Sequence, residues 1–309
     1  MNDSARSIFR RRHVRRIDSD IIGFAMGTDY MAKYSHAFWQ LLLEGAERRA
    51  WEVDKDFMVI WGDDCDEIIA RSYEYYNAGR VDAVISPGFF SKYFPEPPEI
   101  PCASVMETAV PVSPTVVLNS ATGIREMMMH FAKLGHKSLL WVASHQFSHG
   151  QLRADIAKKN AEEQGLEMSS VLLGLDVFNN RKHMTLDIFN VYLCKAIEEY
   201  LDKIKSATAI FCYNDILASC LMQLLLLKGV KVPEDISICG FDNVHSRGTI
   251  PRLTTIDHRI EEMGAASVDL VMELTAEYPC DMSKWRNIVK TIPSNLVIGD
   301  TTGPAPQKK

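Results

Sequence analysis

The sequence predicts an α/β protein with two doubly wound domains, each built on a mostly parallel sheet with helices on both faces. Short continuous apolar runs of strand length recur along the chain, and an amphipathic stretch of helical length separates most of them. About eight such units exceed what one open sheet needs, which favours two domains. The 309 residues, 47% of them hydrophobic, are enough for two cores.

Each expected element follows from its local pattern. The run "IIGFAM" is continuously apolar and predicts the first strand, whereas Ile124, Met127 and Phe131 recur at helical spacing. Glycine after several helical stretches fits a C-terminal cap. The expected strands are 21–26, 57–61, 83–86, 115–118, 138–143, 170–173, 208–213 and 236–241, and the expected helices are 38–53, 65–78, 121–134, 152–164, 185–204 and 215–228. Residues 89–114 contain six prolines and are expected to be mostly connection.

The helical stretch Ile216–Leu227 is apolar nearly all round. A helix on the outside of a sheet should show a polar face, so either a further helix of the chain or a second subunit covers it. Helices at the edge of this architecture have few other partners. The sequence therefore favours a homodimer formed through this helix.

Two successive expected strands end in an Asn/Asp pair. Asp242 and Asn243 follow one strand, and Asn214 and Asp215 follow the other. Because ligands bind outside the carboxyl ends of parallel strands, these groups are expected at one edge, where they can hold hydroxyl groups. Asp215 is expected to cap the next helix, whereas Asn214 and Asp242 are expected to face the ligand.

Composition and motifs argue against several other functions. The formal net charge of -6 gives the body of the protein no general affinity for nucleic acids or membranes, and no run approaches the length of a membrane span. The first residues lack the apolar region of a secretory signal, so a cytoplasmic protein is expected. There is no Gly-rich phosphate loop and no GxSxG motif, and one pair of histidines, His145 and His149, makes a poor metal site. No cofactor or metal is expected.

Several segments resemble the effector-binding core of the LacI/GalR family of bacterial transcription regulators. They are "TAIFCYNDILASCLMQLLLLKGVKVPEDISICGFDN", "PRLTTIDHRIEEMGAASVDLVMEL" and "IPSNLVIGDTTGP", with "NAGRVDAVIS" and "FAKLGHKSLLWVA" upstream. The resemblance covers about residues 20 to 303. It implies the fold of periplasmic sugar-binding proteins, in which two Rossmann-like subdomains are joined by three crossovers and a small ligand, often a sugar or nucleobase, binds in the cleft between them.

The resemblance also implies a set of ligand-binding residues. Phe38 and Trp39 match the aromatic pair that opens the first helix, and Arg153 matches the arginine after the fifth strand. Asn214 and Asp242 match the amide and the acid. Beyond these matches, the expected set includes Asp29, from a first loop longer than the family's usual link, and His145. An aromatic face suits a sugar ring, and the polar groups suit its hydroxyls. Phe38 or Trp39 as plain core, and Arg153 as a solvated helix residue, stay open as alternatives.

The implied domain division places residues 21–144 and 258–287 in an N-terminal subdomain and residues 145–257 and 288–303 in a C-terminal one, followed by a tail at 304–309. Residues 1–20, with six arginines, are expected to be a basic arm or the remnant of a linker, and they are too few for the helix-turn-helix that members of this family normally carry. DNA binding is therefore expected only through a missing or separate helix-turn-helix unit.

The sequence thus predicts a non-catalytic, ligand-sensing core of a regulator with a small polar effector, preferably a carbohydrate. Two alternatives remain. One is a sugar-binding protein of the transport type, which should carry an export signal. The other is a hydrolase or nucleosidase on a similar scaffold, which would recruit Asp215, Asp242 and His145.

Overall fold

The computed structural model describes residues 19–27, 36–88, 99–106, 113–144, 148–174, 186–244, 250–277, 285 and 287–307. Its strands are β1 (Ile21–Gly27), β2 (Asp56–Gly62), β3 (Ala83–Ser86), β4 (Cys102–Val105), β5 (Thr115–Asn119), β6 (Ser138–Ser144), β7 (Glu167–Leu173), β8 (Ala209–Cys212), β9 (Ser237–Asp242), β10 (Thr254–Asp257), β11 (Val289–Pro293) and β12 (Asn295–Val297). Its helices are α3 (His36–Glu52), α4 (Cys65–Asn77), α6 (Ser120–Lys133), α7 (Ser148–Glu163), α8 (Leu186–Glu198), α9 (Leu201–Ser206), α10 (Asp215–Leu227) and α11 (Ile260–Glu277). None of these helices is long and apolar enough to cross a membrane.

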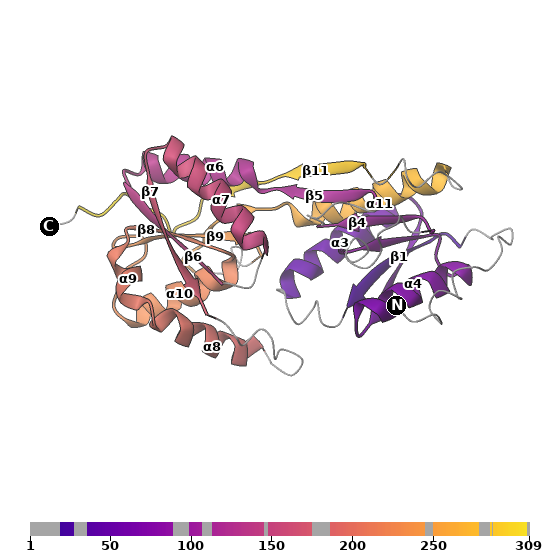
Figure 1. The fold of residues 1–309 in the computed structure, drawn as a ribbon, viewed down its shortest axis with the longest axis horizontal. Coiled ribbons are helices and arrows are strands. Elements are labelled where there is room, and N and C mark those ends of the chain that lie inside the picture. The colour runs from indigo at the N-terminus through magenta and orange to yellow at the C-terminus, as the bar shows by residue number, and fades with distance from the viewer. Residues whose placement is uncertain are drawn as a thin grey trace. The chain divides into compact units, whose positions relative to one another are not determined.

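The chain divides into two compact units, and each is an α/β layer structure (Figure 1). Unit 1 comprises Met1–Leu118 and Ile260–Ile292, and its sheet has the strand order β11-β5-β4-β3-β1-β2. The pairings of β1 with β2 and β3, and of β4 with β3 and β5, are parallel. Helices α3 and α11 pack together and against this sheet, and α4 packs against β1 and β2.

Two glycines set the close packing of α3 and α11 in unit 1. A Cβ atom at Gly45 would collide with the backbone of Glu261, and one at Gly264 would collide with the carbonyl of Leu42 and approach the Ala46 nitrogen to 2.7 Å. Only residues without a side chain allow the two backbones to come this near. The helix pair therefore depends on these two positions.

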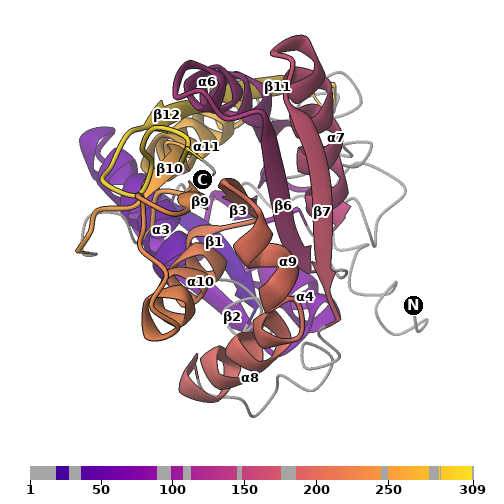
Figure 2. The ribbon, with the colours of Figure 1, turned by 90° about the vertical axis from the view of Figure 1, so that its left-hand side faces the viewer.

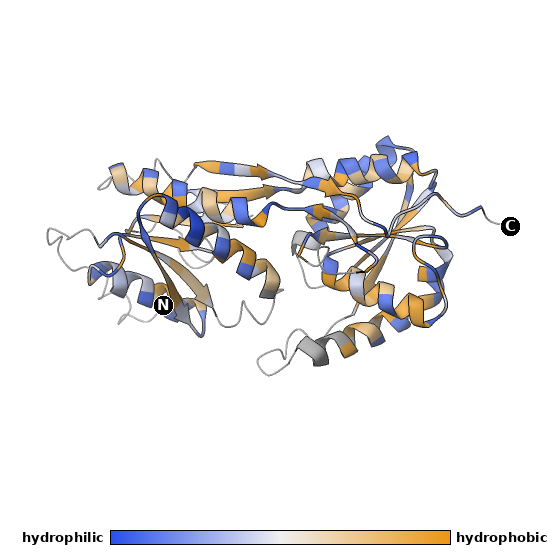
Figure 3. Cartoon of the chain, turned by 180° about the vertical axis from the view of Figure 1, so that it is seen from behind, coloured by the Kyte–Doolittle hydropathy of each residue, from blue (hydrophilic) through white to orange (hydrophobic). Residues whose placement is uncertain are grey.

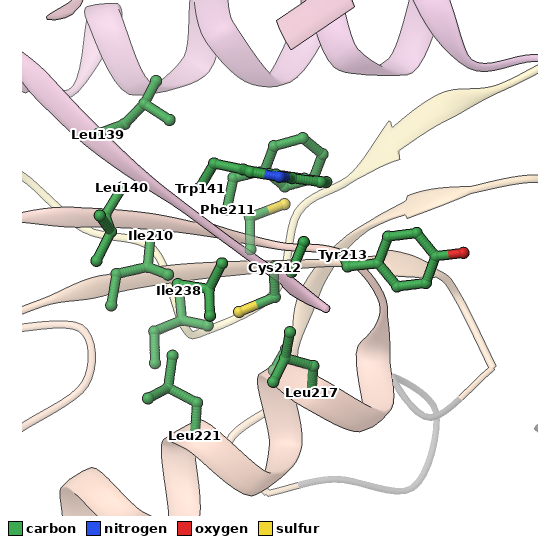
Figure 4. Close-up of a cluster of buried hydrophobic side chains, with 14 of the residues drawn as sticks. Leu139, Leu140, Trp141, Ile210, Phe211, Cys212, Tyr213, Leu217, Leu221 and Ile238 are labelled. Atoms are coloured by element: carbon green, nitrogen blue, oxygen red, sulfur yellow. The ribbon is translucent and has the colours of Figure 1, made fainter. Parts of the chain in front are cut away.

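Unit 2 comprises Asn119–Arg259 and Pro293–Lys309, with the strand order β12-β10-β9-β8-β6-β7. Helices α6 and α7 pack together and contact strands of this sheet, whereas α10 packs against β8, β9 and α8 (Figure 2). Apolar side chains of the strands and of α10 fill the interior (Figure 4). Trp141 and Phe211 lie at its centre, with ring centroids 4.6 Å apart.

The predicted fold class is confirmed, but several elements differ from expectation. The first crossover follows Leu118 rather than residue 144, so α6 and β6 belong to unit 2. The other two boundaries lie at 259/260 and 292/293, close to the expected positions. Strand β4 lies inside the proline-rich stretch that was expected to be connection, and the helix expected at 185–204 ends at Glu198 and is followed by α9.

The apolar helix α10 is covered on one side by a helix of its own unit. Leu193 and Ile197 of α8 belong to the same buried cluster as Leu221 and Leu225 of α10. This helix–helix layer explains part of the apolar character that had favoured a second subunit. The hydropathy colouring shows hydrophobic residues along the strands and alternating with hydrophilic ones along the helices (Figure 3). At the end of α10, Leu226 and Leu227 remain 71% and 83% exposed.

Candidate functional site

The carboxyl ends of the central strands of unit 2 bring polar groups to one edge of its sheet. Strands β6, β8, β9 and β10 run parallel, and Asp257 at the end of β10 is in register with Asp242 at the end of β9. His258 follows β10 directly, and Tyr213 and Asn214 follow β8. This edge is where open parallel sheets bind ligands.

Arg153 on α7 is held at this edge by stacking and hydrogen bonding. Its guanidinium carbon lies 3.8 Å from the ring centroid of Phe241 and 4.8 Å from that of Tyr213. Its Nη1 donates to the Tyr213 carbonyl at 2.8 Å, and the side chain is 11% exposed. The flat, charged group is therefore fixed against two aromatic rings, which rules out a solvated helix residue.

Arg153, Asp242 and His258 form a compact polar cluster. The Asp242 Oδ1 atom lies 3.5 Å from Nη2 of Arg153 and 3.3 Å from Nε2 of His258, and the distance between those two nitrogens is 3.2 Å. The carboxylate is 12% exposed and the imidazole is fully buried. Burial lowers the pKa of His258 below its ordinary value, although the hydrogen bond with Asp242 acts in the opposite direction.

The backbone at the end of β9 is strained. Asp242 has a φ of 99° and Asn243 a φ of 57°, both in the region that favours glycine. The surrounding contacts hold this turn, because the Asn243 Nδ2 donates to Asp257 at 2.9 Å and the Val244 N–H donates to Asp215 at 2.9 Å. The strain places the Asp242 carboxylate next to Arg153 and His258 instead of continuing the strand.

The assignment of the helix cap to Asp215 is wrong. Asn214 is the N-cap of α10, and its Oδ1 accepts from the Leu217 N–H at 3.0 Å. Asp215 is fully buried and accepts from the Thr255 hydroxyl at 2.6 Å. Its side chain also fills the space beside Gly240, so Asp215 packs against β9, the strand that ends at Asp242. The ligand-binding role of Asn214 stays a prediction, with its Oδ1 already engaged in the cap.

The other expected ligand residues lie in unit 1 or outside the described residues. Phe38 and Trp39 open α3, where their rings meet edge to face with centroids 5.5 Å apart. They are 6% and 1% exposed, a burial typical of core residues. Asp29 and His145 fall outside the residues that the structure describes.

Sequence reasoning missed His258. It follows "TTID", a strand end at the same sheet edge as Asp242, so the rule that selected Asp242 also selects this histidine once β10 is recognised as a strand. The cluster offers a fixed cationic donor, Arg153, and a carboxylate acceptor, Asp242, which are close enough for one ligand hydroxyl to bind both. Such a pair suits a polyhydroxylated ligand. Among the described residues no three potential ligands are grouped so that they could hold a metal ion.

Comparison with known proteins places the fold in a family. Residues 128–302 match the model of the periplasmic-binding-protein-like domain, which is more than half of the chain. The chain belongs to the periplasmic-binding-protein-like family. A curated relative, the HTH-type transcriptional regulator DegA of Bacillus subtilis strain 168, is 30% identical over 171 residues, which is 54% of this chain and 47% of the relative. The expected resemblance to the effector-binding core of LacI-type regulators is thereby confirmed.

Solved structures agree with this family assignment at the level of the fold. A periplasmic binding protein/LacI transcriptional regulator from Alkaliphilus metalliredigens QYMF, complexed with D-xylulofuranose, aligns with a TM-score of 0.70 at 20% identity over 92% of this chain and 99% of that one. A LacI family regulator from Enterococcus faecium with bound ribose aligns with a TM-score of 0.67 at 21% identity, with the same coverage. The alignment with DegA spans about half of that relative's length.

Proposed function

We propose that the chain is the ligand-sensing core of a cytoplasmic LacI-type transcriptional regulator that binds a small polar effector, preferably a sugar or sugar derivative. The observation that carries this proposal is the cluster of Arg153 and Asp242 at the carboxyl ends of the unit 2 strands. Two similar folds hold pentose sugars, which supports the carbohydrate class. Contact with DNA belongs in this proposal to a separate helix-turn-helix unit.

Arg153 and Asp242 have complementary roles in the proposed site. The guanidinium, stacked on Phe241, has its N–H donors in a fixed plane, so it can donate to the oxygen of a ligand hydroxyl. The Asp242 carboxylate can accept a hydrogen bond from the same or a neighbouring hydroxyl. Their separation of 3.5 Å is long for a direct charged pair, which leaves both groups capacity for a ligand.

The structure gives the enzyme alternative no support. Asp215, the second carboxylate that a hydrolase would recruit, is fully buried and accepts from Thr255 and Val244, so it stabilises the fold instead of facing a substrate. DegA and the ribose-bound Enterococcus faecium protein are both named as transcriptional regulators. The transport alternative shares the periplasmic-binding-protein-like fold, but the curated relative DegA is named as a transcriptional regulator, which favours the regulator.

Calorimetry and thermal-shift measurements with D-ribose and D-xylulose, and with adenine and guanine as nucleobase probes, test the proposal. Arg153→Ala and Asp242→Asn should each weaken binding of the sugar by about tenfold to a hundredfold, because each removes a hydrogen bond to a charged group. The matched controls are Arg125→Ala and Asp155→Asn, which change exposed residues of α6 and α7. Equal binding by all four variants would refute the site, and binding of a nucleobase alone would correct the ligand class.

The proposed regulator is a homodimer that uses the exposed end of α10 and the adjacent surface of α8. Leu226, Leu227, Val191 and Tyr192 are large hydrophobic residues with 43–83% of their surface exposed. Apolar surface of this kind on paired helices is typical of subunit contacts. Sedimentation should show a dimer that Leu226→Glu with Leu227→Glu dissociates, whereas Leu172→Glu on β7 should leave it intact; a monomeric wild-type chain would overturn the proposal.

A further inference from the structure

His258 has an environment that a residue used only for packing would not need. The ring is fully buried and lies 4.4 Å from the Phe241 ring, centroid to centroid. Its Nδ1 is buried and has no hydrogen-bond partner among the described residues. An apolar side chain would fill this space without leaving a polar atom unpaired, so the histidine carries a cost in stability that an apolar residue would not.

The Nε2 atom of His258 faces a donor and an acceptor at the same time. Arg153 Nη2 is 3.2 Å away and Asp242 Oδ1 is 3.3 Å away. If Nε2 is unprotonated it accepts from Arg153, and if it is protonated it donates to Asp242. One atom cannot do both, so the position of a single proton decides which member of the pair the ring engages.

We propose that His258 is a positioning residue of the effector site, which orients the Arg153 guanidinium and leaves the Asp242 carboxylate open to the effector only while its ring is neutral and carries its proton on Nδ1. This inference rests on the proposed function, since it concerns the same site. A charged ring would bind the carboxylate through its Nε2–H and would place a second cation beside the guanidinium. Effector binding would then compete with both effects.

The charges around the ring decide the direction of the pH dependence. Arg153 faces it from α7, Asp242 from β9 and Asp257 from β10, while Asp215 on α10 is engaged with Thr255 and Val244. Burial holds the pKa of His258 below its ordinary value, so the ring is neutral at pH 7. Affinity for the effector should therefore be constant above about pH 6.5 and should fall by about tenfold for each pH unit below the pKa of the ring.

Binding of D-ribose and D-xylulose to the full chain, measured by calorimetry from pH 8 to pH 5, tests the link to the effector. His258→Gln keeps a donor and an acceptor but does not titrate, so it should bind at neutral pH within about threefold of the wild type and lose the pH dependence. His258→Leu should weaken binding at every pH. The control His130→Gln, which removes a half-buried histidine of α6, should keep the wild-type profile.

A second measurement needs no ligand. In the full chain labelled at histidine with ¹⁵N, the resonance missing from His258→Gln identifies the ring. Asp242→Asn should lower the pKa of His258 because it removes the charge that stabilises the protonated ring, and Arg153→Ala should raise it. A titration that neither substitution moves would show that His258 does not engage the pair.

The outcomes separate this inference from the proposed function. If the sugar binds and Asp242→Asn weakens binding as expected, but His258→Gln retains the wild-type pH profile, the effector site stands and the role of His258 is wrong. If neither sugar nor nucleobase binds, the proposed function fails, and the NMR titration alone decides whether His258 orients Arg153 and Asp242.

Discussion

Units 1 and 2 have six-stranded sheets of similar topology but place different chemistry at the ends of their strands. In unit 2 the edge carries charged groups, with Asp242 and Arg153 beside the buried His258. In unit 1 the buried polar groups near the strand ends are hydroxyls, of which Ser104 bonds Ser113 and Ser86 has no partner among the described residues. One architecture therefore supports two different surfaces, because the residues at the strand ends, not the strand order, define the chemistry.

The buried charged groups at the edge of unit 2 make its stability depend on more specific contacts than the stability of unit 1 does. Each charged group at its edge needs a partner, since an isolated buried ion is costly. Asp215, Thr255 and Gly240 form the layer below the site, and a change there should reach Asp242 through the strand. Unit 1 instead relies on the close backbone contact between α3 and α11.

Adding one methyl group at a close-packed glycine should give the largest effect, and Gly240 tests this in unit 2. A Cβ atom there would collide with the Asp215 carboxylate and lie 2.8 Å from Leu253 Cδ2. Gly240→Ala should therefore destabilise unit 2 by about 2–3 kcal/mol, the upper range for an overpacked core. Hydrogen exchange followed by mass spectrometry should show faster exchange of β8 and β9 and unchanged exchange of β1 and β2.

Two matched substitutions sharpen this comparison. Gly264→Ala places the same methyl group against the backbone of α3 and should accelerate exchange in unit 1 alone. Gly174→Ala adds a methyl group where no atom lies within 4 Å and should change neither unit. If Gly240→Ala accelerates exchange equally in both units, the two do not unfold separately and the contrast drawn between them is wrong.

The strands were predictable where their apolar runs were continuous, and the site was predictable where polar residues followed such runs. The run "ISICGF" followed by Asp242 illustrates both. Strand β4 was not predictable in the same way, because its apolar run is interrupted by Ser104 and directly follows Pro101. The position of the first crossover depends on tertiary packing that no local pattern records.

The sequence predicted Asp215 as the cap of α10, whereas in the structure the cap is Asn214, one residue earlier in the chain. Both residue types cap helices well, so propensity does not separate them. The structure does so because β8 ends at Cys212 and leaves Asn214 in extended backbone, while Asp215 is already helical and buried against Thr255. The sequence did not indicate His258, because the segment "PRLTTI" before it was interpreted as a family motif and not as a strand.

Lowering the pH should destabilise unit 2 more than unit 1, with an effect smaller than that of the glycine substitutions and larger than that of losing a surface ion pair. Among the residues that the structure describes, unit 1 contains one histidine, His36, and unit 2 contains four, His130, His136, His149 and His258. His136 is buried and bonds Thr208 and Ser237, and His130 bonds Thr302 at the C-terminal segment. Burial lowers the pKa of both rings, so protonation is harder in the folded state than in the unfolded chain.

The sign of the pH effect follows from these lowered values. The stability that the neutral rings provide is fully present above the unfolded pKa of about 6.5 and is lost as the pH falls through the lower pKa of the folded state. Between pH 7 and pH 5, exchange should therefore accelerate more in unit 2 than in unit 1, and His136→Gln should reduce that difference. Equal acceleration in both units would assign the acid sensitivity to other groups.

Surface ion pairs should give the smallest effect. Lys290 and Glu273 lie 2.7 Å apart in unit 1 with side chains 31% and 52% exposed, and Lys228 and Glu198 lie 3.2 Å apart in unit 2 with side chains 42% and 48% exposed. Exposed pairs of this kind contribute about 0.2–1 kcal/mol and are screened by salt. Glu273→Gln and Glu198→Gln should each change the free energy of unfolding by no more than that, and the change should vanish in 1 M salt.

Denaturant titrations of both variants at low and high salt measure this effect. Similar small losses in the free energy of unfolding would mean that surface ion pairs contribute equally to both units. The difference between the units would then come from the buried charges at the edge of unit 2. A loss well above about 1 kcal/mol in only one variant would instead place part of that difference on the surface. The same increase in salt should weaken the interaction between Arg153 and Asp242 much less. Their side chains are 11% and 12% exposed, and ions in solution screen buried charges less than exposed ones.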